Sequence, residues 1–201
     1  FIGLLPILYS IVKKENIATY ISSFLLAISV TEVFSYLIWF EIIEPFKNAT
    51  ITNPTPFMSH ISYNPILAFA IYLVLHELCF NKKFTNFKFS LYSFFAISMS
   101  INMFITGGRA GQVVFFVMLA ILIFQVLGNQ RFKSLLVIFI LIPGIFLTAY
   151  QTSPLFKSRV DLATSEIISY SDKKNSSVGL RINFAINSWE IIKKNPFIGV
   201  G

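Results

Sequence analysis

The segment ITGGRAG, residues 105–111, separates two apolar runs, 91–105 and 110–127, that contain no charged residue. A membrane-spanning helix needs about 20 mostly apolar residues, so the pattern predicts two spans joined by a short turn. Arg109 then lies where the hydrocarbon region ends. A charge in that position is costly and is usually retained for function.

Composition supports a membrane protein. Hydrophobic residues make up 55% of the 201 residues and charged residues 12%, whereas soluble domains carry about 25% charged residues. The net charge of +7 comes from basic residues scattered in short loops. This pattern is typical of membrane proteins and argues against a nucleic-acid partner. The single cysteine, Cys79, excludes a disulfide within the chain and is expected to pack.

Outward from residues 105–111, the spacing of apolar runs predicts an all-α, polytopic transmembrane helical bundle. The runs are 1–12, 17–40, 65–80, 91–105, 110–127 and 134–150. The third and fourth are short and are expected to borrow flanking residues. We therefore expect a transmembrane region, 1–150, with five full spans and one truncated span. Residues 151–201 are expected to begin a large outer loop that is truncated at its C-terminus, as in an internal fragment of a larger protein.

Basic residues in the connecting segments predict the orientation. One set of loops holds most of them: Lys13, Lys14, Lys82, Lys83, Lys88, Arg131 and Lys133. By the positive-inside rule these loops are cytoplasmic. The segments 41–64 and 106–110, and everything after Tyr150, are then outside. Residues 41–64 are rich in Pro, Thr and Asn and are expected to be irregular.

Residues 178–195 have helical periodicity within the outer loop. The predicted helix is apolar on two sides, which favours a mostly buried helix. Arg181 lies in the strip between the apolar sides, so we expect it to point into protein or toward the membrane. Pro196 ends the helix.

Two isolated arginines, Arg109 and Arg181, are the candidate catalytic and substrate-binding residues. Guanidinium groups match phosphate oxygens bidentately, so the pair suggests a site for an anionic, membrane-borne substrate. Glycines 107, 108 and 111 let backbone and ligand approach closely beside Arg109. The alternative for Arg109 is an arginine that snorkels to the interface. Arg159 is a further substrate-binding candidate, although Asp161 nearby also fits a surface charge.

Glu32 lies inside the second run, about 12 Å below its outer end at 1.5 Å per residue. A carboxylate within the membrane must face a partner or a cavity, which makes Glu32 a substrate-binding candidate. Two other interpretations stay open. Glu32 can pair with Arg109, or it can be a protonated structural residue.

Metal ligands and cofactor motifs are not evident in the sequence. Glu41 and Glu44 are expected to share a helix face at i,i+3 spacing and could hold a metal, but two glutamates at a helix end are more often solvated. No outer loop contains an Asp-x-Asp or Glu-x-Asp pair. His60 is expected to pack within its loop. We therefore expect no metal and no cofactor.

Two motifs resemble the superfamily of O-antigen ligases and Wzy-type O-antigen polymerases. TGGRAG, residues 106–111, resembles the family's small-residue-Ser-Arg-Gly turn at the outer end of a span, with glycine in place of the serine. Gly179-Leu180-Arg181, Trp189 and NPFIGVG, residues 195–201, resemble the family's Arg–Trp–Asn-Pro–Gly-x-Gly stretch in the large outer loop. The resemblance covers most of the chain.

The resemblance implies a metal-independent glycosyltransferase of C-type architecture in the bacterial inner membrane, active at the periplasmic face. Its donor is a glycan on undecaprenyl diphosphate, and Arg109 and Arg181 match the arginines that hold the diphosphate. The acceptor is a glycan, lipid A-core or a protein. The family's ligases also use a histidine that lies beyond Gly201 here.

Three enzyme types share these features: ligase, polymerase and protein O-oligosaccharyltransferase. Only the acceptor distinguishes them. A transporter or flippase of a lipid-linked anionic glycan is the alternative from another class, and it predicts charged residues along several helix interiors. Only Glu32 is deep within a run. A purely structural membrane subunit explains neither Arg109 nor its glycines.

Overall fold

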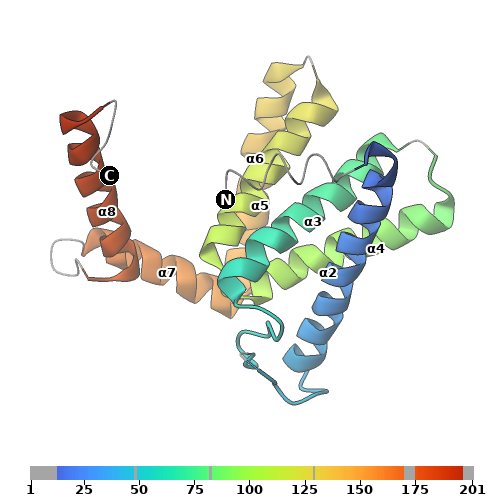
Figure 1. Cartoon of the computed structure of the whole chain (residues 1–201), viewed down its shortest axis with the longest axis horizontal. Helices are drawn as coiled ribbons and strands as arrows, with labels where there is room; N and C mark the ends of the chain where they lie inside the picture. Colours follow the sequence, from blue (N-terminus) through green and yellow to red (C-terminus); the bar gives the residue numbers. More distant parts are fainter. Residues whose placement is uncertain (1–12, 48, 82, 129, 170–174, 197–201) are drawn as a thin grey trace. The chain divides into compact units, whose positions relative to one another are not determined.

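The computed structural model describes residues 13–47, 49–81, 83–128, 130–169 and 175–196. The predicted partial span 1–12 and the end of the 195–201 motif lie outside these ranges. The chain forms two compact units, residues 1–149 and 150–201, which we describe separately (Figure 1).

The described residues form helices and no strand. A short 3-10 helix, η1 (Lys14–Asn16), precedes seven α-helices: α2 (Ile17–Trp39), α3 (His60–Phe80), α4 (Asn86–Ile105), α5 (Arg109–Leu127), α6 (Arg131–Thr152), α7 (Pro154–Ile168) and α8 (Ser177–Lys194). The predicted all-α class is therefore confirmed.

Within the described part of the chain, five helices are long and apolar enough to cross a membrane, namely α2 with η1, α3, α4, α5 and α6. The shortest, α5, has 19 residues and is about 28 Å long at 1.5 Å per residue. This length matches a hydrocarbon core of about 30 Å. As expected, the two short runs borrow flanking residues, since α3 and α4 each begin five residues before the run does.

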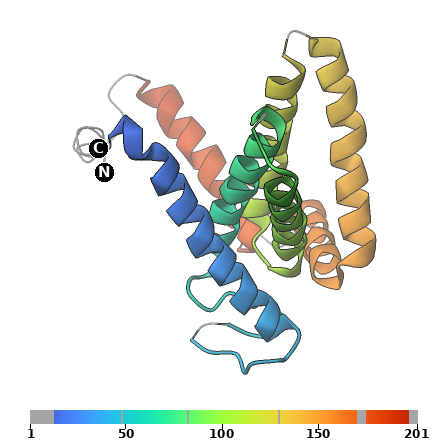
Figure 2. The same cartoon turned by 90° about the vertical axis from the view of Figure 1, so that its right-hand side faces the viewer.

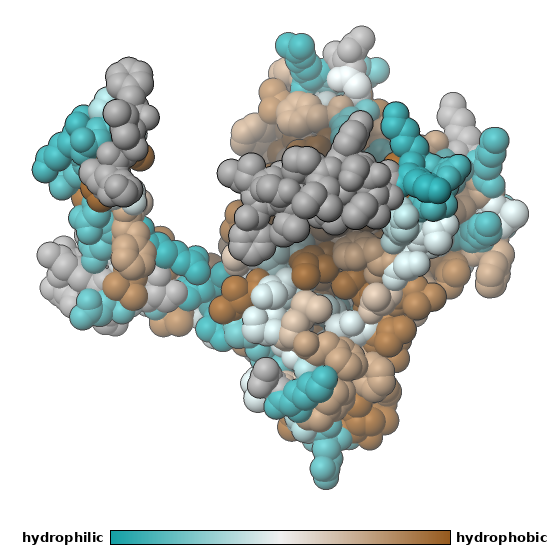
Figure 3. Space-filling view, in the orientation of Figure 1, coloured by the Kyte–Doolittle hydropathy of each residue, from teal (hydrophilic) through white to brown (hydrophobic). Residues whose placement is uncertain are grey.

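Large apolar side chains are exposed on every span. Examples are Leu26 at 68%, Phe94 at 64% and Phe139 at 74%. Figure 3 shows apolar residues over these helices and hydrophilic residues near their ends. Soluble proteins rarely expose such continuous apolar surface, so these faces fit contact with lipid or with further helices.

Helix α3 is the centre of unit 1, where it packs against α2, α4 and α5 (Figures 1 and 2). Its buried residues recur at helical spacing and include Tyr63, Leu67, Ile71 and Val74. They face buried residues of α4 and α5, among them Met99, Met103 and Phe115. This packing brings the start of α3 to the end of α4 and the start of α5.

The segment between α2 and α3 folds back on the end of α2. Phe46 and Phe57 pack edge-to-face against Phe34 of α2, and the Lys47 ammonium lies 5.3 Å from the centre of the Phe57 ring. The segment is irregular, as predicted, and Thr55 within it is 2% exposed. It therefore adds a packed layer over this end of the bundle.

Helix α7 in unit 2 was not predicted from the sequence. Ser153 caps it, since its hydroxyl accepts from the Phe156 N–H at 3.1 Å, and Pro154 occupies the first turn. A serine N-cap followed by proline is a recognised helix start. Hydropathy did not reveal α7 because this helix is much less apolar than the spans.

Candidate functional site

Arg109 is the first residue of α5, directly after a three-residue turn. Helix α4 ends at Ile105, and the extended conformation of Thr106 breaks the helix (φ −108°, ψ 146°). Gly108 is the N-cap of α5, so it offers no side chain to cap the first turn. Arg109 itself is half-buried.

Gly108 and Gly111 are needed because α3 approaches this turn closely. A Cβ atom on Gly108 would lie 2.7 Å from the Asn64 side chain. One on Gly111 would lie 2.6 Å from the Pro65 nitrogen and would also overlap Asn64. The predicted close backbone approach is therefore observed, and the approaching group is α3.

Buried polar side chains hold the turn to α3 and α4. The Thr106 hydroxyl donates to Asn64 Oδ1 at 2.8 Å and also lies 3.0 Å from the Asn102 carbonyl. The Asn64 amide donates to the Gly108 carbonyl at 3.4 Å. Asn64, Asn102 and Thr106 are 0% exposed. Polar side chains between membrane helices bind adjacent helices together in this way.

Gln112 completes the end of α4. Its amide donates to the carbonyls of Met103 and Thr106, each at 3.3 Å. The last carbonyls of a helix have no partner within the helix, and in a membrane they must be satisfied by other groups. A side chain from the first turn of α5 therefore stabilises the end of α4.

Asn102 extends the polar contacts toward α2. It accepts from the Tyr63 hydroxyl at 3.0 Å and donates to the Ser35 hydroxyl at 2.9 Å. Both partners are 0% exposed. The contacts therefore join α2, α3 and α4 just below the turn.

The α2–α3 segment reaches the same turn from outside. Asn53 Oδ1 accepts from the Gly107 N–H at 3.1 Å, and Asn53 Nδ2 lies 2.6 Å from His60 Nδ1. Because the Gly107 contact fixes the amide orientation, Asn53 donates to His60. His60 packs within its segment, as predicted. The structure therefore brings together residues 41–64 and 106–110, which the positive-inside rule predicted to lie on one side of the membrane.

Glu32 is buried on α2, at 2% exposure. Neither carboxyl oxygen has a hydrogen-bond partner among the described residues. Glu32 faces a pocket of about 180 Å³ that Phe94, Phe95 and Ser98 of α4 also line. The Ser98 hydroxyl donates instead to the Phe95 carbonyl at 3.4 Å. The suggested Glu32–Arg109 pair is therefore not formed.

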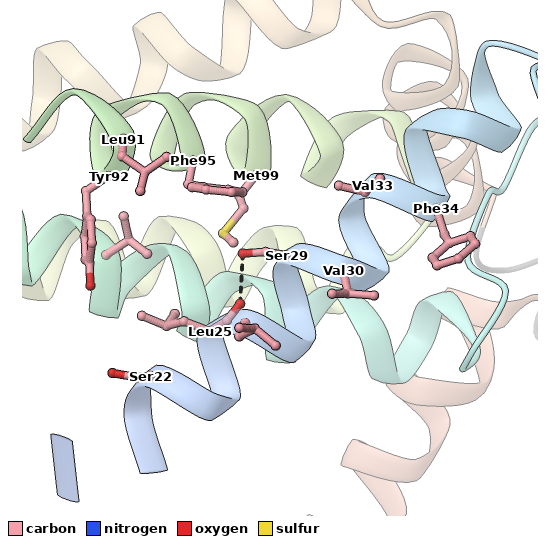
Figure 4. Close-up of a pocket in the computed structure, with 12 residues that line it drawn as sticks. Ser22, Leu25, Ser29, Val30, Val33, Phe34, Leu91, Tyr92, Phe95 and Met99 are labelled. Carbon is pink, nitrogen blue, oxygen red and sulfur yellow. Dashed lines mark hydrogen bonds between the residues drawn. The ribbon is translucent and has the colours of Figure 1, made fainter. Parts of the chain in front are cut away.

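A second, larger pocket of about 530 Å³ lies between α2 and α4 and shares Val33 and Phe95 with the Glu32 pocket. Figure 4 shows Leu91, Tyr92, Phe95 and Met99 of α4 facing α2 across it. Apolar side chains dominate the lining, with Ser22 and Ser29 as exceptions. The two pockets form one apolar surface with a carboxyl group toward one end.

Glu41 and Glu44 do not share a helix face, because α2 ends at Trp39 and Glu41 adopts a positive φ of 58°. Both side chains are exposed. Among the residues that the structure describes, no three His, Cys, Asp or Glu side chains form a group suited to a metal ion.

Arg159 lies in the middle of α7 and is half-buried. Asp161 accepts a hydrogen bond of 2.6 Å from the Tyr150 hydroxyl. The Asp161 carboxylate, which lies two residues after Arg159 in the sequence, is therefore hydrogen-bonded to Tyr150 within unit 2.

Arg181 lies near the start of α8 and is exposed. The first turn of α8 is well capped, since Ser176 Oγ accepts from the Gly179 N–H at 3.0 Å and Glu166 Oε2 accepts from the Val178 N–H at 3.1 Å. The predicted burial of α8 is not met within unit 2, because apolar residues such as Trp189, 58% exposed, remain uncovered. The reason is that α7 is the element that packs against α8 in this unit.

The candidate residues divide between the two units. Glu32 and Arg109 belong to unit 1, whereas Arg159 and Arg181 belong to unit 2. Asn64, Asn102 and Gln112 were not predicted from the sequence, and Thr106 was predicted only as part of the TGGRAG motif. Asparagine and glutamine within apolar runs were an available signal, because buried amides in a membrane need partners.

The electrostatics at Arg109 favour an anion. The N-terminus of a helix carries a partial positive charge, so a cation in the first turn is unfavourable by roughly 0.3–1 kcal/mol at low ionic strength. Arg109 adds a guanidinium to that end of α5. An anion bound there interacts favourably with both charges.

Comparisons with known proteins give two matches. A sequence model of the family described as O-antigen ligase matches residues 94–201. This range contains the 106–108 turn, Arg109, Arg159 and Arg181, while Glu32 lies before it.

An uncharacterized protein of Haemophilus influenzae is 34% identical to the chain over 160 residues. The match covers 74% of this chain and 38% of that protein, so the chain spans well under half the length of this relative. No solved structure matches.

Proposed function

Because the chain belongs to the O-antigen ligase family, we propose that it is part of a membrane glycosyltransferase that uses a glycan on undecaprenyl diphosphate. The transfer takes place at the periplasmic face of the bacterial inner membrane. The acceptor is a growing glycan, lipid A-core or a protein.

The reaction requires stabilisation of a leaving group. The bond between the sugar C1 and the diphosphate oxygen breaks, and C1 forms a new bond to an acceptor hydroxyl oxygen. The bonding electrons remain on the diphosphate, while the hydroxyl proton passes to a base. Positive groups placed where this charge develops accelerate the reaction.

Arg109 at the start of α5 is the observation that carries the proposal. The helix terminus and the guanidinium together attract an anion at the end of a membrane span. Arg109 contacts the diphosphate in the proposed complex. Arg181 contributes the second guanidinium, and a bidentate contact between arginine and phosphate is stronger than a neutral hydrogen bond.

Arg159 and Glu32 are proposed as further substrate contacts. Arg159 adds positive charge for the anionic part of the donor. Glu32 is buried within a span at a pocket whose other lining residues are mainly apolar. The apolar lining suits the hydrocarbon chain of the carrier, and the Glu32 carboxyl group is proposed to bind a polar group of the substrate. No metal or cofactor is included in the proposal, and none of the described residues is assigned as the base.

A transporter of lipid-linked anionic glycans is the alternative function. It needs a hydrophilic route across the membrane. The larger pocket between α2 and α4 is instead mainly apolar, and Glu32 lines the smaller pocket next to it. This lining favours the transferase.

The test uses R109A and R181A in the full-length protein, with R131A as control. Arg131 is exposed and is the first residue of α6, at the end of the span that is predicted to be cytoplasmic. We expect R109A and R181A to abolish transfer with normal membrane insertion, and R131A to be active. Lipid-linked intermediates and surface glycans are measured together. Full activity in R109A or R181A would remove that residue from the proposal.

Deletion of the gene distinguishes the enzyme types. A bare acceptor with accumulated long lipid-linked chains identifies a ligase. An acceptor that carries a single repeat unit identifies a polymerase. An unchanged glycan pattern contradicts a role in surface-glycan assembly and favours the transporter.

A further inference from the structure

Asn64 contacts the chain around Arg109 at three places, two in the turn before it and one in the first turn of α5. Its Oδ1 accepts from Thr106 Oγ1 at 2.8 Å, and its Nδ2 donates to the Gly108 carbonyl at 3.4 Å. Its side chain also fills the space where a Cβ of Gly111 would lie. Contacts on both sides of Arg109 therefore come from one residue of α3.

These contacts are shielded from solvent. Asn64 and Thr106 are both 0% exposed. A buried donor or acceptor that loses its partner cannot turn to water, so breaking one of these hydrogen bonds is costly. The burial thus favours one arrangement of the turn over alternatives that differ by small shifts.

Asn53 holds the other side of the turn. It accepts from the Gly107 N–H at 3.1 Å and donates to His60 at the start of α3. The backbone of residues 106–108 is therefore fixed from within the bundle by Asn64 and from outside by Asn53.

Helices α3 and α5 also make a contact that does not involve the turn 106–108. The same two helices are also joined farther along by Tyr72, whose hydroxyl donates to Gln125 Oε1 at 3.0 Å. That bond is exposed and lies about four helical turns from Arg109 along α5. The contacts of Asn64 and Asn53 differ because they end on the turn itself.

We propose that Asn53, Asn64 and Thr106 are positioning residues that fix the turn 106–108 and so set the position of Arg109 against the donor diphosphate. This inference rests on the proposed function. The three residues act through Arg109 and do not contact the substrate. Displacement of a catalytic group by about 1 Å can lower the rate on the order of 100-fold, so loss of one such contact has a measurable effect.

The first test compares T106V with T106S in the full-length protein. Valine keeps the shape of threonine and removes the hydroxyl, whereas serine keeps the hydroxyl. We expect T106V to lower kcat/KM for the lipid-linked donor about 10- to 100-fold, and T106S to retain more than about half of the activity. Equal activity of T106V and the unaltered protein would overturn the proposal.

Y72F is the matched control. It removes a hydrogen bond between the same helices but leaves the turn intact. We expect its kcat/KM to stay within about twofold of the unaltered protein, because this hydrogen bond lies about four helical turns from Arg109 and does not involve the turn 106–108. If Y72F lowers activity as much as T106V does, loss of α3–α5 attachment explains both results and the positioning role is wrong.

A double substitution tests whether the effect passes through Arg109. In R109K, whose point charge cannot form the bidentate contact, T106V should cost less than about twofold. The same fold-loss in both backgrounds would show an effect independent of Arg109. If T106V does not fold, N53A replaces T106V in this comparison, because Asn53 is half-buried whereas Thr106 is fully buried.

The outcomes separate this inference from the proposed function. Full activity in R109A removes the proposed role of Arg109 itself. Loss of activity in R109A, combined with full activity in both T106V and N53A, leaves the proposed function standing and overturns the positioning role.

Discussion

Glu32 shows how a single buried group can oppose stability. Its carboxyl oxygens have no hydrogen-bond partner among the described residues, and the surrounding pocket is lined mainly by apolar and aromatic side chains. Such a group costs about 1–3 kcal/mol relative to a satisfied one. Residues that weaken the fold in this way are commonly retained for function.

We therefore expect E32L to raise the melting temperature of the purified protein and to lower transfer activity. Leucine fills a similar volume and needs no hydrogen bond. E32Q, which keeps the polar group without charge, should retain more activity than E32L. Thermal unfolding in detergent and a transfer assay on the same preparations provide the check. Full activity in E32L would show that Glu32 does not contact substrate.

Gly111 and Gly144 provide a comparison of two helical glycines. A Cβ on Gly111 would overlap Asn64 and Pro65, whereas one on Gly144 would meet no atom within 4 Å. G111A should therefore destabilise the protein by about 1–3 kcal/mol through overpacking. G144A should be neutral or stabilising by up to about 1 kcal/mol, because alanine favours a helix. Thermal unfolding of both variants decides, and equal melting temperatures would contradict the α3–α5 packing.

Residues of the candidate site differ in how far the sequence reveals them. Arg109 was predicted because a lone charge beside apolar runs is costly wherever the neighbours lie. Asn64 was not, because its partners Thr106 and Gly108 are more than 40 positions away, and nothing local identifies them. The glycines were predicted to permit close approach, but only packing identifies α3 as what approaches.

Helices also differ in how far the sequence predicts them. The spans were predicted to within a few residues, because their apolar length reflects the membrane thickness. Helix α7 was missed because amphipathic surface helices lack that signal. Its start depends on the Ser153 cap, and serine is too common in the chain for one serine to predict a helix start. The burial of α8 stays a prediction, because periodicity describes a face but not what covers it.

Helix α8 depends on its caps for the placement of Arg181. Glu166 of α7 accepts from the Val178 N–H, and its negative charge also interacts favourably with the helix N-terminus. We expect E166A to weaken the first turn by about 0.5–2 kcal/mol, or roughly 2- to 30-fold faster amide exchange at Val178 and Gly179. Hydrogen exchange with mass spectrometry measures this change. E190A, an exposed substitution farther along α8, should leave exchange in the first turn unaltered, and a similar increase in both variants would contradict the cap.

At the scale of the molecule, the five candidate spans follow one another along the chain, so they alternate in direction if each crosses the membrane. The α2–α3 segment and the turn 106–108 must then lie on one side of the membrane, and the Asn53–Gly107 hydrogen bond agrees with this. The basic loops lie on the other side. The positive-inside rule predicts that this other side is cytoplasmic.

Labelling of single cysteines in cells tests this orientation. In a C79S background, T52C lies in the α2–α3 segment, K83C lies in a basic loop, and K157C lies in α7; all three positions are exposed. A membrane-impermeant maleimide should label T52C and K157C in cells with a permeabilised outer membrane, and K83C only after lysis. This result is expected because, in the proposed function, Arg109 at the same end as Thr52 meets a donor at the periplasmic face. The opposite labelling pattern would place Arg109 on the cytoplasmic side, where the proposed periplasmic transfer cannot occur, and would favour a protein that handles the lipid-linked glycan before it crosses the membrane.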